Sequence, residues 1–379
     1  MAPVRFIHTS DIHIGARYST LPRGVADRRR NDLRETFAAI VDLATNGSPE
    51  VDLLLISGDL FETAFPASGD VFFVREKLQI AAKAGVRTFL IPGNHDEYRP
   101  GSFWDGVSLP VEHVFHDYTF EAHTVPELNL TVWGAAMNPV HTGERMLGAF
   151  PSEAVVGRSI LLFHGNWLGY GPDDAPRYSP FEASDIKRLP VNYVALGHHH
   201  GFKQVVMESG RKALYPGSPE ATTFGRAELG DRFVVRGEIS EDGAVHVEKV
   251  KINKATHLAE SIECTHETTE SLRRRVGNSS GQENLLKLTL TGHASLELVA
   301  AAETLEEEMT CEFAHLEVRS EIADIDDEMD DNVYFRSFRE DLLRRMRDAA
   351  PEEQPALRKA LEIGTIAFVS GRQRGVSRG

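Results

Sequence analysis

Five short clusters of metal-binding residue types are spread over the first 200 residues of this 379-residue chain. Carboxylate, amide and imidazole groups without a thiolate suit a borderline-hard divalent ion such as Mn²⁺, with Fe or Zn as alternatives. Seven candidate ligands are too many for one ion, so the pattern favours two ions that share a carboxylate, as in two-metal hydrolytic centres. These candidates are Asp11, His13, Asp59, Asn94, His164, His198 and His200.

The local sequence around these residues supports the same hypothesis. Extended backbone through His198-His199-His200 would turn the outer two imidazoles to one side and the middle imidazole away. Glycines at positions 58, 93, 165 and 197 permit tight turns and close approach of the backbone. We therefore expect His198 and His200, but not His199, to serve the ions.

Each cluster follows a short apolar run that is typical of a strand buried on both faces. The carboxyl ends of parallel strands meet at one edge of a sheet, so the clusters are expected to converge there. Residues 28–45 and 70–84 show apolar positions at helical spacing and predict covering helices. The predicted fold class is α/β, with a layered sheet core. The runs are 4–10, 51–57, 86–92, 130–135, 159–164 and 191–196.

The remainder of the chain predicts smaller parts. Hairpin-like strands after residue 210 end the catalytic domain, expected at 1–253. Residues 254–322 alternate strand and helix patterns and predict a small α+β capping domain. An acidic linker at 323–332, a helical arm at 333–370 and a basic disordered tail at 371–379 complete the expected organisation.

Composition narrows the class of protein. Hydrophobic residues make up 41% of the chain and charged residues 26%, which excludes wholesale disorder. The net charge of −16 is unlike that of a domain held on nucleic acid by bulk positive charge. Two cysteines favour a reducing compartment, and neither a signal peptide nor an 18-residue apolar span is recognisable. We therefore expect a cytoplasmic protein.

The motifs DIH, GDLF, GNHD, FHG and GHHH, in this order, resemble those of the calcineurin-like metallophosphoesterases. The HTSDIHIG opening and the segment YPGSPEATTFG at 215–225 resemble the SbcD-type nuclease subunits of DNA double-strand-break repair. The resemblance implies that Asp11, His13, Asp59 and His200 hold one ion. It implies that Asp59, Asn94, His164 and His198 hold the other.

The resemblance also implies catalytic roles. His95 would lie beside the scissile phosphate and polarise it or protonate the leaving oxygen, with Asp96 orienting the ring. Two divalent ions, two aspartates and a hydroxide would leave the site about +1, which favours an anionic phosphodiester. This chain has Glu62 where some relatives carry a histidine that assists exonuclease action.

The implied function is a Mn²⁺-dependent nuclease, with 3′ to 5′ exonuclease activity on duplex ends and endonuclease activity on single strands. Its expected partners are DNA, a second copy of the chain and an SbcC-type ATPase with coiled-coil arms, at the nucleoid. Two alternatives remain open from the sequence. One is a metallophosphatase or small-molecule phosphodiesterase, and the other is a structural subunit that organises DNA ends.

Two further features have a functional and a structural interpretation. The basic run Arg23, Arg28, Arg29 and Arg30 could contact DNA phosphates or could form a solvated helix face. The stripe Phe335, Phe338, Leu342 and Met346 could dock the coiled coil of a partner or pack within the chain.

Overall fold

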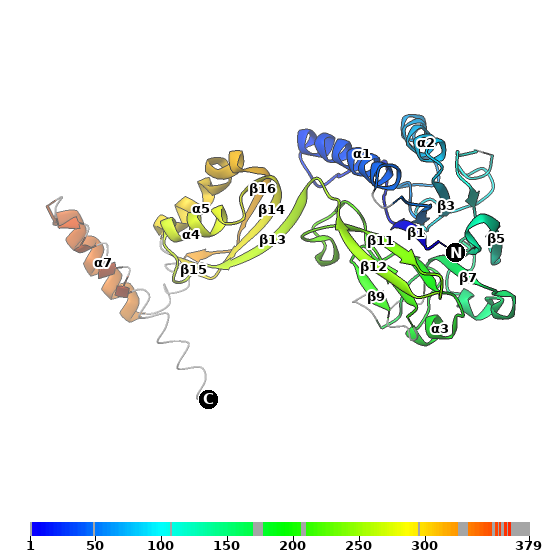
Figure 1. The fold of residues 1–379 in the computed structure, drawn as a ribbon. Coiled ribbons are helices and arrows are strands. Elements are labelled where there is room, and N and C mark those ends of the chain that lie inside the picture. Colours follow the sequence, from blue (N-terminus) through cyan, green and yellow to red (C-terminus); the bar gives the residue numbers. More distant parts are fainter. Residues whose placement is uncertain are drawn as a thin grey trace. The chain divides into compact units, whose positions relative to one another are not determined.

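The computed structural model describes residues 2–47, 50–106, 108–169, 177–205, 210–294, 296–324 and 333–350, with separate positions between 353 and 364. The chain divides into two compact units, Met1–His257 and Leu258–Gly379 (Figure 1). Within the described ranges, no helix combines the length and the apolar character needed to cross a membrane.

The first unit contains two six-stranded sheets. In the first sheet the order is β12-β11-β1-β2-β3-β4, with β1 to β4 parallel and with β11 and β12 antiparallel to their neighbours. Its strands are β1 (Val4–Thr9), β2 (Leu53–Ser57), β3 (Arg87–Ile91), β4 (His113–Val114), β11 (Phe233–Ile239) and β12 (Val245–Lys251).

The second sheet has the order β5-β6-β7-β8-β10-β9. Strands β6, β7, β8 and β10 are parallel, and the edge strands β5 and β9 are antiparallel to their neighbours. Its strands are β5 (Glu121–Val125), β6 (Leu130–Gly134), β7 (Arg158–His164), β8 (Tyr193–Gly197), β9 (Lys203–Val205) and β10 (Lys212–Tyr215). All six predicted apolar runs are strands, which confirms the α/β class.

The main core lies between the two sheets. It joins Phe6, Leu55 and Phe89 of the first sheet to Ile160 and Tyr193 of the second, all fully buried. Strands covered on both faces need apolar residues at nearly every position, which explains the continuous Val, Ile and Leu runs. The sandwich brings the ends of strands from both sheets to one edge of the unit.

Helices cover the outer faces of the two sheets. Helices α1 (Arg23–Thr45) and α2 (Ser68–Lys83) contact each other and strands β1 to β3 (Figure 1). The short helix α3 (Ala183–Arg188) contributes Ile186 to a second core on the outer side of the other sheet. Short 3₁₀ turns span Pro126–Leu128, Met146–Ala149, Ser152–Ala154 and Arg226–Glu228.

The second unit is a small α+β layer. A three-stranded sheet, ordered β13-β14-β16, packs its apolar side chains against α4 and α5. Strands β14 and β16 are parallel and are joined through α5, as a crossover connection requires. The elements are β13 (Thr256–Glu263), α4 (Thr269–Gly277), β14 (Gly281–Thr291), β15 (His293–Ala294), α5 (Leu296–Met309), a 3₁₀ turn (Thr310–Glu312), β16 (Phe313–Ser320) and β17 (Ala323–Asp324).

The last described helix, α7 (Val333–Asp348), changes the interpretation of the apolar stripe. Phe335 is fully buried and Leu342 nearly so, within this chain itself. Docking of a partner through these two residues would therefore require α7 to give up contacts within its own chain. Phe338 and Met346 are half-buried, and a Cβ at Gly364 would overlap the Phe338 ring. The exposed apolar side chains of α7 are Val333, Tyr334 and Leu343.

Parts of the predicted organisation fall outside the described residues. Ala323 and Asp324 of the expected acidic linker form β17, which pairs with β15. Residues 325–332 and the predicted tail at 371–379 lie outside the described ranges.

Candidate metal centre

The predicted ligands lie at the carboxyl ends of five strands: His164 is the last residue of β7, and the others lie on the loops that leave β1, β2, β3 and β8. The backbone N–H of Asp11 donates to the carbonyl of Gly58 (3.0 Å), which joins the first two loops. The backbone N–H of His198 donates to the Asp11 carboxylate (3.0 Å), which joins the second sheet to the first. Loops from both sheets therefore meet at one site.

Four of these residues have an unusual backbone. Asp11, His13, Asp59 and His198 have φ values of 51°, 55°, 50° and 110°, which non-glycine residues rarely adopt. Such conformations persist only where the surrounding structure imposes them, and they cluster at functional sites. The tight packing is visible at Gly93, where a Cβ would overlap the Asp59 carboxylate.

Two imidazole nitrogens face each other in the first group of ligands. His13 Nε2 lies 3.2 Å from His200 Nε2, and a carboxylate oxygen of Asp11 lies within 4.8 Å of both ligand atoms. On the far side of each ring, His13 Nδ1 is 3.0 Å from Glu62 and His200 Nδ1 is 3.0 Å from Glu228. These carboxylates favour protons on the two Nδ1 atoms, so both Nε2 lone pairs would point inward, where a bound cation would satisfy them.

A second group forms around the amide oxygen of Asn94. His164 Nε2 and His198 Nδ1 each lie 2.9 Å from Asn94 Oδ1. His164 Nδ1 donates to the carbonyl of Ser57 (2.9 Å), so its Nε2 carries a lone pair that faces another acceptor. This arrangement of acceptors also fits a cation.

Asp59 lies between the two groups. Its Oδ2 is 3.8 Å from His13 Nε2 and 3.5 Å from His164 Nε2, and its Oδ1 accepts the backbone N–H of His95 (2.8 Å). The residues present therefore fit two divalent cations with Asp59 shared, and the absence of sulfur ligands agrees with a Mn²⁺-like ion.

The electrostatics of the buried groups follow from their neighbours. Burial opposes ionisation of Asp59, but His164, His13 and His95 lower its pKa. Burial, together with the charge of Asp59, raises the pKa of Asp96. Burial lowers the pKa of His198 to about 3, which keeps this imidazole neutral and able to bind a metal.

His95 lies at the open side of the site, with 41% of its side chain exposed. The predicted orientation by Asp96 is not what the structure shows. Asp96 is buried and accepts the backbone N–H groups of Gly93 (2.7 Å) and Phe61 (3.1 Å), so it holds the loop. The carboxylate beside the His95 ring is Glu62, at 3.8 Å from Nδ1.

The segment at 215–225 positions His200 from the outside. Glu228, just beyond it, contacts His200 Nδ1 and also accepts the backbone N–H of Thr223 (3.1 Å). Burial raises the pKa of Glu228, but the contact with His200 and the backbone donors lower it to about 2. His199 turns away from this group and accepts the backbone N–H of Trp167 (3.2 Å).

The basic run on α1 is divided by the structure. Arg29 is 1% exposed and pairs with Glu220 and Asp32, so the candidate DNA contact at Arg29 is wrong: a buried guanidinium cannot reach a phosphate. Arg30 pairs with Asp27 at the surface, and Arg23 and Arg28 are exposed.

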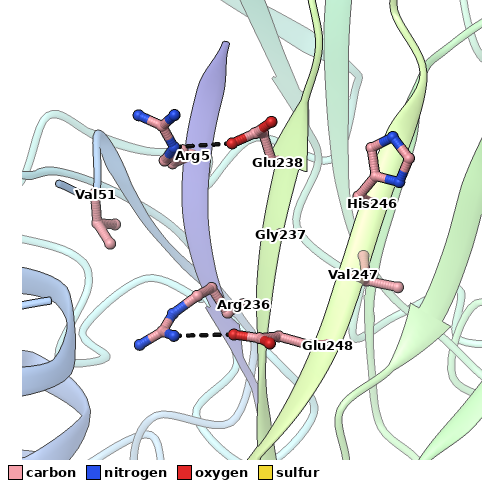
Figure 2. Close-up of a pocket in the computed structure, with 8 residues that line it drawn as sticks. All are labelled: Arg5, Val51, Arg236, Gly237, Glu238, His246, Val247 and Glu248. Carbon is pink, nitrogen blue, oxygen red and sulfur yellow. Dashed lines mark hydrogen bonds and ion pairs between the residues drawn. The ribbon is translucent and has the colours of Figure 1, made fainter. Parts of the chain in front are cut away.

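A separate pocket of about 310 Å³ lies on β1, β11 and β12 (Figure 2). Arg5 pairs with Glu238 (2.8 Å) and Arg236 pairs with Glu248 (2.9 Å), so its arginines are already neutralised. It contains none of the candidate ligands.

Comparison with known proteins agrees with this site. Residues 4–237 match the model of the calcineurin-like phosphoesterases. The chain therefore belongs to the calcineurin-like phosphoesterase family, as the motifs predict. This assignment defines a metal-dependent phosphoesterase.

Among individual proteins, the chain is 24% identical over 326 residues to the uncharacterized metallophosphoesterase YhaO of Bacillus subtilis, covering 81% of this chain and 76% of that protein. It is 28% identical over 302 residues to the DNA double-strand break repair protein Mre11 of Methanopyrus kandleri, covering 72% and 62%. For Mre11 of Sulfurisphaera tokodaii the values are 27% over 227 residues, covering 58% and 55%. The matches thus span less than two thirds of these two Mre11 proteins.

Sequence reasoning missed what the residues outside the motifs do. Glu62 and Glu228 contact the rings of two candidate ligands, but no motif spacing marks them as partners of histidines. The sequence did single out Glu62, as the residue in place of a histidine of some relatives, but gave no sign that it contacts His13.

Proposed function

We propose that this protein is a metal-dependent nuclease that processes DNA double-strand-break ends by two-metal phosphodiester hydrolysis. The proposed activities are 3′ to 5′ exonuclease on duplex ends and endonuclease on single strands. Mn²⁺ is the proposed metal. The observation that carries the proposal is the convergence of two acceptor groups on the shared Asp59, with His95 exposed beside them.

Different residues of the chain would bind the cations and donate the proton. In this proposal Asp11, His13, Asp59 and His200 hold one cation, and Asp59, Asn94, His164 and His198 hold the other. The bound cations would activate water and neutralise the phosphate oxygens during in-line attack. His95 would then donate a proton to the leaving oxygen or a hydrogen bond to the phosphate.

The DNA assignment is supported by similarity rather than by the site alone. Four of the proteins that the chain resembles over more than half of its length are Mre11 proteins of DNA double-strand break repair. The same centre would also serve a metallophosphatase or small-molecule phosphodiesterase, and the similarity to YhaO leaves that class as the second candidate.

The proposed assembly has three further parts. Two copies of the chain would associate, an SbcC-type ATPase would bind the helical region that includes α7, and the second unit would help select DNA. With the net charge of −16, DNA affinity would depend on the partner and on local charge at the site. Arg23, Arg28 and Arg30 remain the proposed DNA contacts on α1. The assembly would act in the cytoplasm, at the nucleoid.

The test is Mn²⁺-dependent degradation of end-labelled duplex and single-stranded DNA, with and without the ATPase. Wild type should cut, and the pattern of labelled products should give the polarity. Asp59→Ala should lose the activity because both ions lose a ligand, and His95→Ala should lose about 100-fold or more, as for a general acid.

Two other outcomes would change the assignment. Hydrolysis of bis(p-nitrophenyl) phosphate without cleavage of any DNA would favour the small-molecule phosphodiesterase. Normal end processing by His95→Ala in the assembled complex would favour a structural role for this subunit.

A further inference from the structure

We propose that Glu62 is a positioning residue that orients both a metal ligand, His13, and the proton donor, His95. The inference rests on the proposed two-metal hydrolysis and assigns a role to a residue outside every motif. Both nitrogens concerned are Nδ1 atoms, at 3.0 Å from Glu62 Oε2 for His13 and 3.8 Å from Glu62 Oε1 for His95.

The backbone fixes Glu62 in this position. The residue before it, Phe61, forms a β-bridge with Ile14, and the backbone N–H of Glu62 donates to the carbonyl of Ile14 (3.0 Å). Ile14 is the neighbour of His13 in the chain. The loop after β2 is thereby attached to the loop after β1, which brings the carboxylate to the ring of His13.

The two histidine rings are in contact with each other. Their centroids lie 4.6 Å apart with an interplanar angle of 86°. The Glu62 carboxylate directs one oxygen toward each ring, and it can therefore orient both histidines. Asp96 cannot replace it because both of its oxygens accept backbone N–H groups.

The orientation has a chemical consequence for each ring. With the Glu62 carboxylate 3.0 Å from its Nδ1, the His13 ring would keep its proton on Nδ1 and would present the Nε2 lone pair to a bound cation. With its Nδ1–H facing the same carboxylate, the His95 ring in its doubly protonated form would direct its Nε2–H toward the substrate. After the attacking water has released one proton to solvent, the hydroxide oxygen bonds to phosphorus, the ester P–O bond breaks, and the Nε2 proton of His95 moves to the leaving oxygen.

The test compares wild type with Glu62→Gln, which keeps the side-chain size and removes the charge. The first readout is Mn²⁺ binding by calorimetry. Loss of such an outer carboxylate should weaken the binding of one ion by about tenfold or more.

The second readout is kcat at saturating Mn²⁺ on two aryl diesters. Diphenyl phosphate has a poorer leaving group than bis(p-nitrophenyl) phosphate and depends more on a proton donor. Glu62→Gln should lower kcat by about tenfold or more on diphenyl phosphate and by less than about threefold on bis(p-nitrophenyl) phosphate.

Neither readout requires DNA, so failure of the DNA assignment leaves this test intact. Glu144→Gln, which removes an exposed carboxylate beside His141 (3.7 Å), is the control and should match wild type. Thermal denaturation establishes that the variants are folded. Unchanged Mn²⁺ affinity, or an equal loss on both diesters, would overturn the proposal.

Discussion

At the scale of single residues, the site depends on which nitrogen of each imidazole faces inward. Ser57, Glu62 and Glu228 contact the outer nitrogens of His164, His13 and His200 and so select the tautomer that can bind a cation. The motifs contain the ligands, so the ligands were predictable. Two of the three outer partners were not, because they reach the rings through the folded path of the chain.

The packing around Asp59 gives a prediction at this scale. Gly93→Ala places a Cβ where the Asp59 carboxylate lies, so the shared ligand must move. We expect Mn²⁺ affinity, measured by calorimetry, to fall by about tenfold or more. Gly69→Ala, in α2 with open space around its Cα, is the control and should bind like wild type. Full Mn²⁺ affinity in Gly93→Ala would show that Asp59 is not held by this contact.

At the scale of elements, the apolar runs predicted the strands but not their division between two sheets. A strand buried on both faces has the same pattern whether its neighbours lie in one sheet or two. The edge strands β4, β5 and β9 are short or carry polar residues such as Glu121 and Lys203. They therefore lack the apolar run from which the other strands were predicted. Helix α1 begins at Arg23, five residues before the predicted start, because Arg23 to Asp27 contain Val25 as their one large apolar residue and so show no helical spacing.

Substitution of the α1 arginines can distinguish a structural role from a role in DNA binding. Arg29→Met leaves Glu220 as an unpaired buried charge, and Thr36 Oγ1 at 2.7 Å cannot neutralise it. The free energy of unfolding should fall by about 3 kcal/mol or more, measured by urea denaturation. Arg23→Met at the exposed helix start should leave stability within about 0.5 kcal/mol. Equal stability of Arg29→Met and wild type would contradict the buried ion pair.

At the scale of the whole molecule, every candidate ligand and its outer partner lies in Met1–His257. The last residue of this unit, His257, packs against the same unit. His257 stacks on Phe224, with centroids 4.6 Å apart, and its Nδ1 lies 2.8 Å from the carbonyl of Thr223. The segment at 215–225, which helps to position His200, is therefore held in place by His257, the last residue of the unit.

We predict that a chain ending after His257 hydrolyses bis(p-nitrophenyl) phosphate with a kcat/KM within about threefold of the full chain, since catalysis of a small substrate needs only the site residues. A chain ending after Asn253 lacks the His257 contact and should be less stable by thermal denaturation. Loss of activity in the longer version, with folding retained, would place part of the active site in the second unit.

The left-handed backbone at Asp11, His13, Asp59 and His198 connects the site to the folding equilibrium. Each such residue costs about 1–2 kcal/mol relative to ordinary helical or extended backbone. The surrounding sandwich must supply this energy whether or not ions are bound. A ligand that binds only the folded state increases the free energy of unfolding, by about 2.7 kcal/mol at a free ligand concentration 100 times its Kd. Metal supply would therefore contribute to the free energy of unfolding as well as to the rate of reaction.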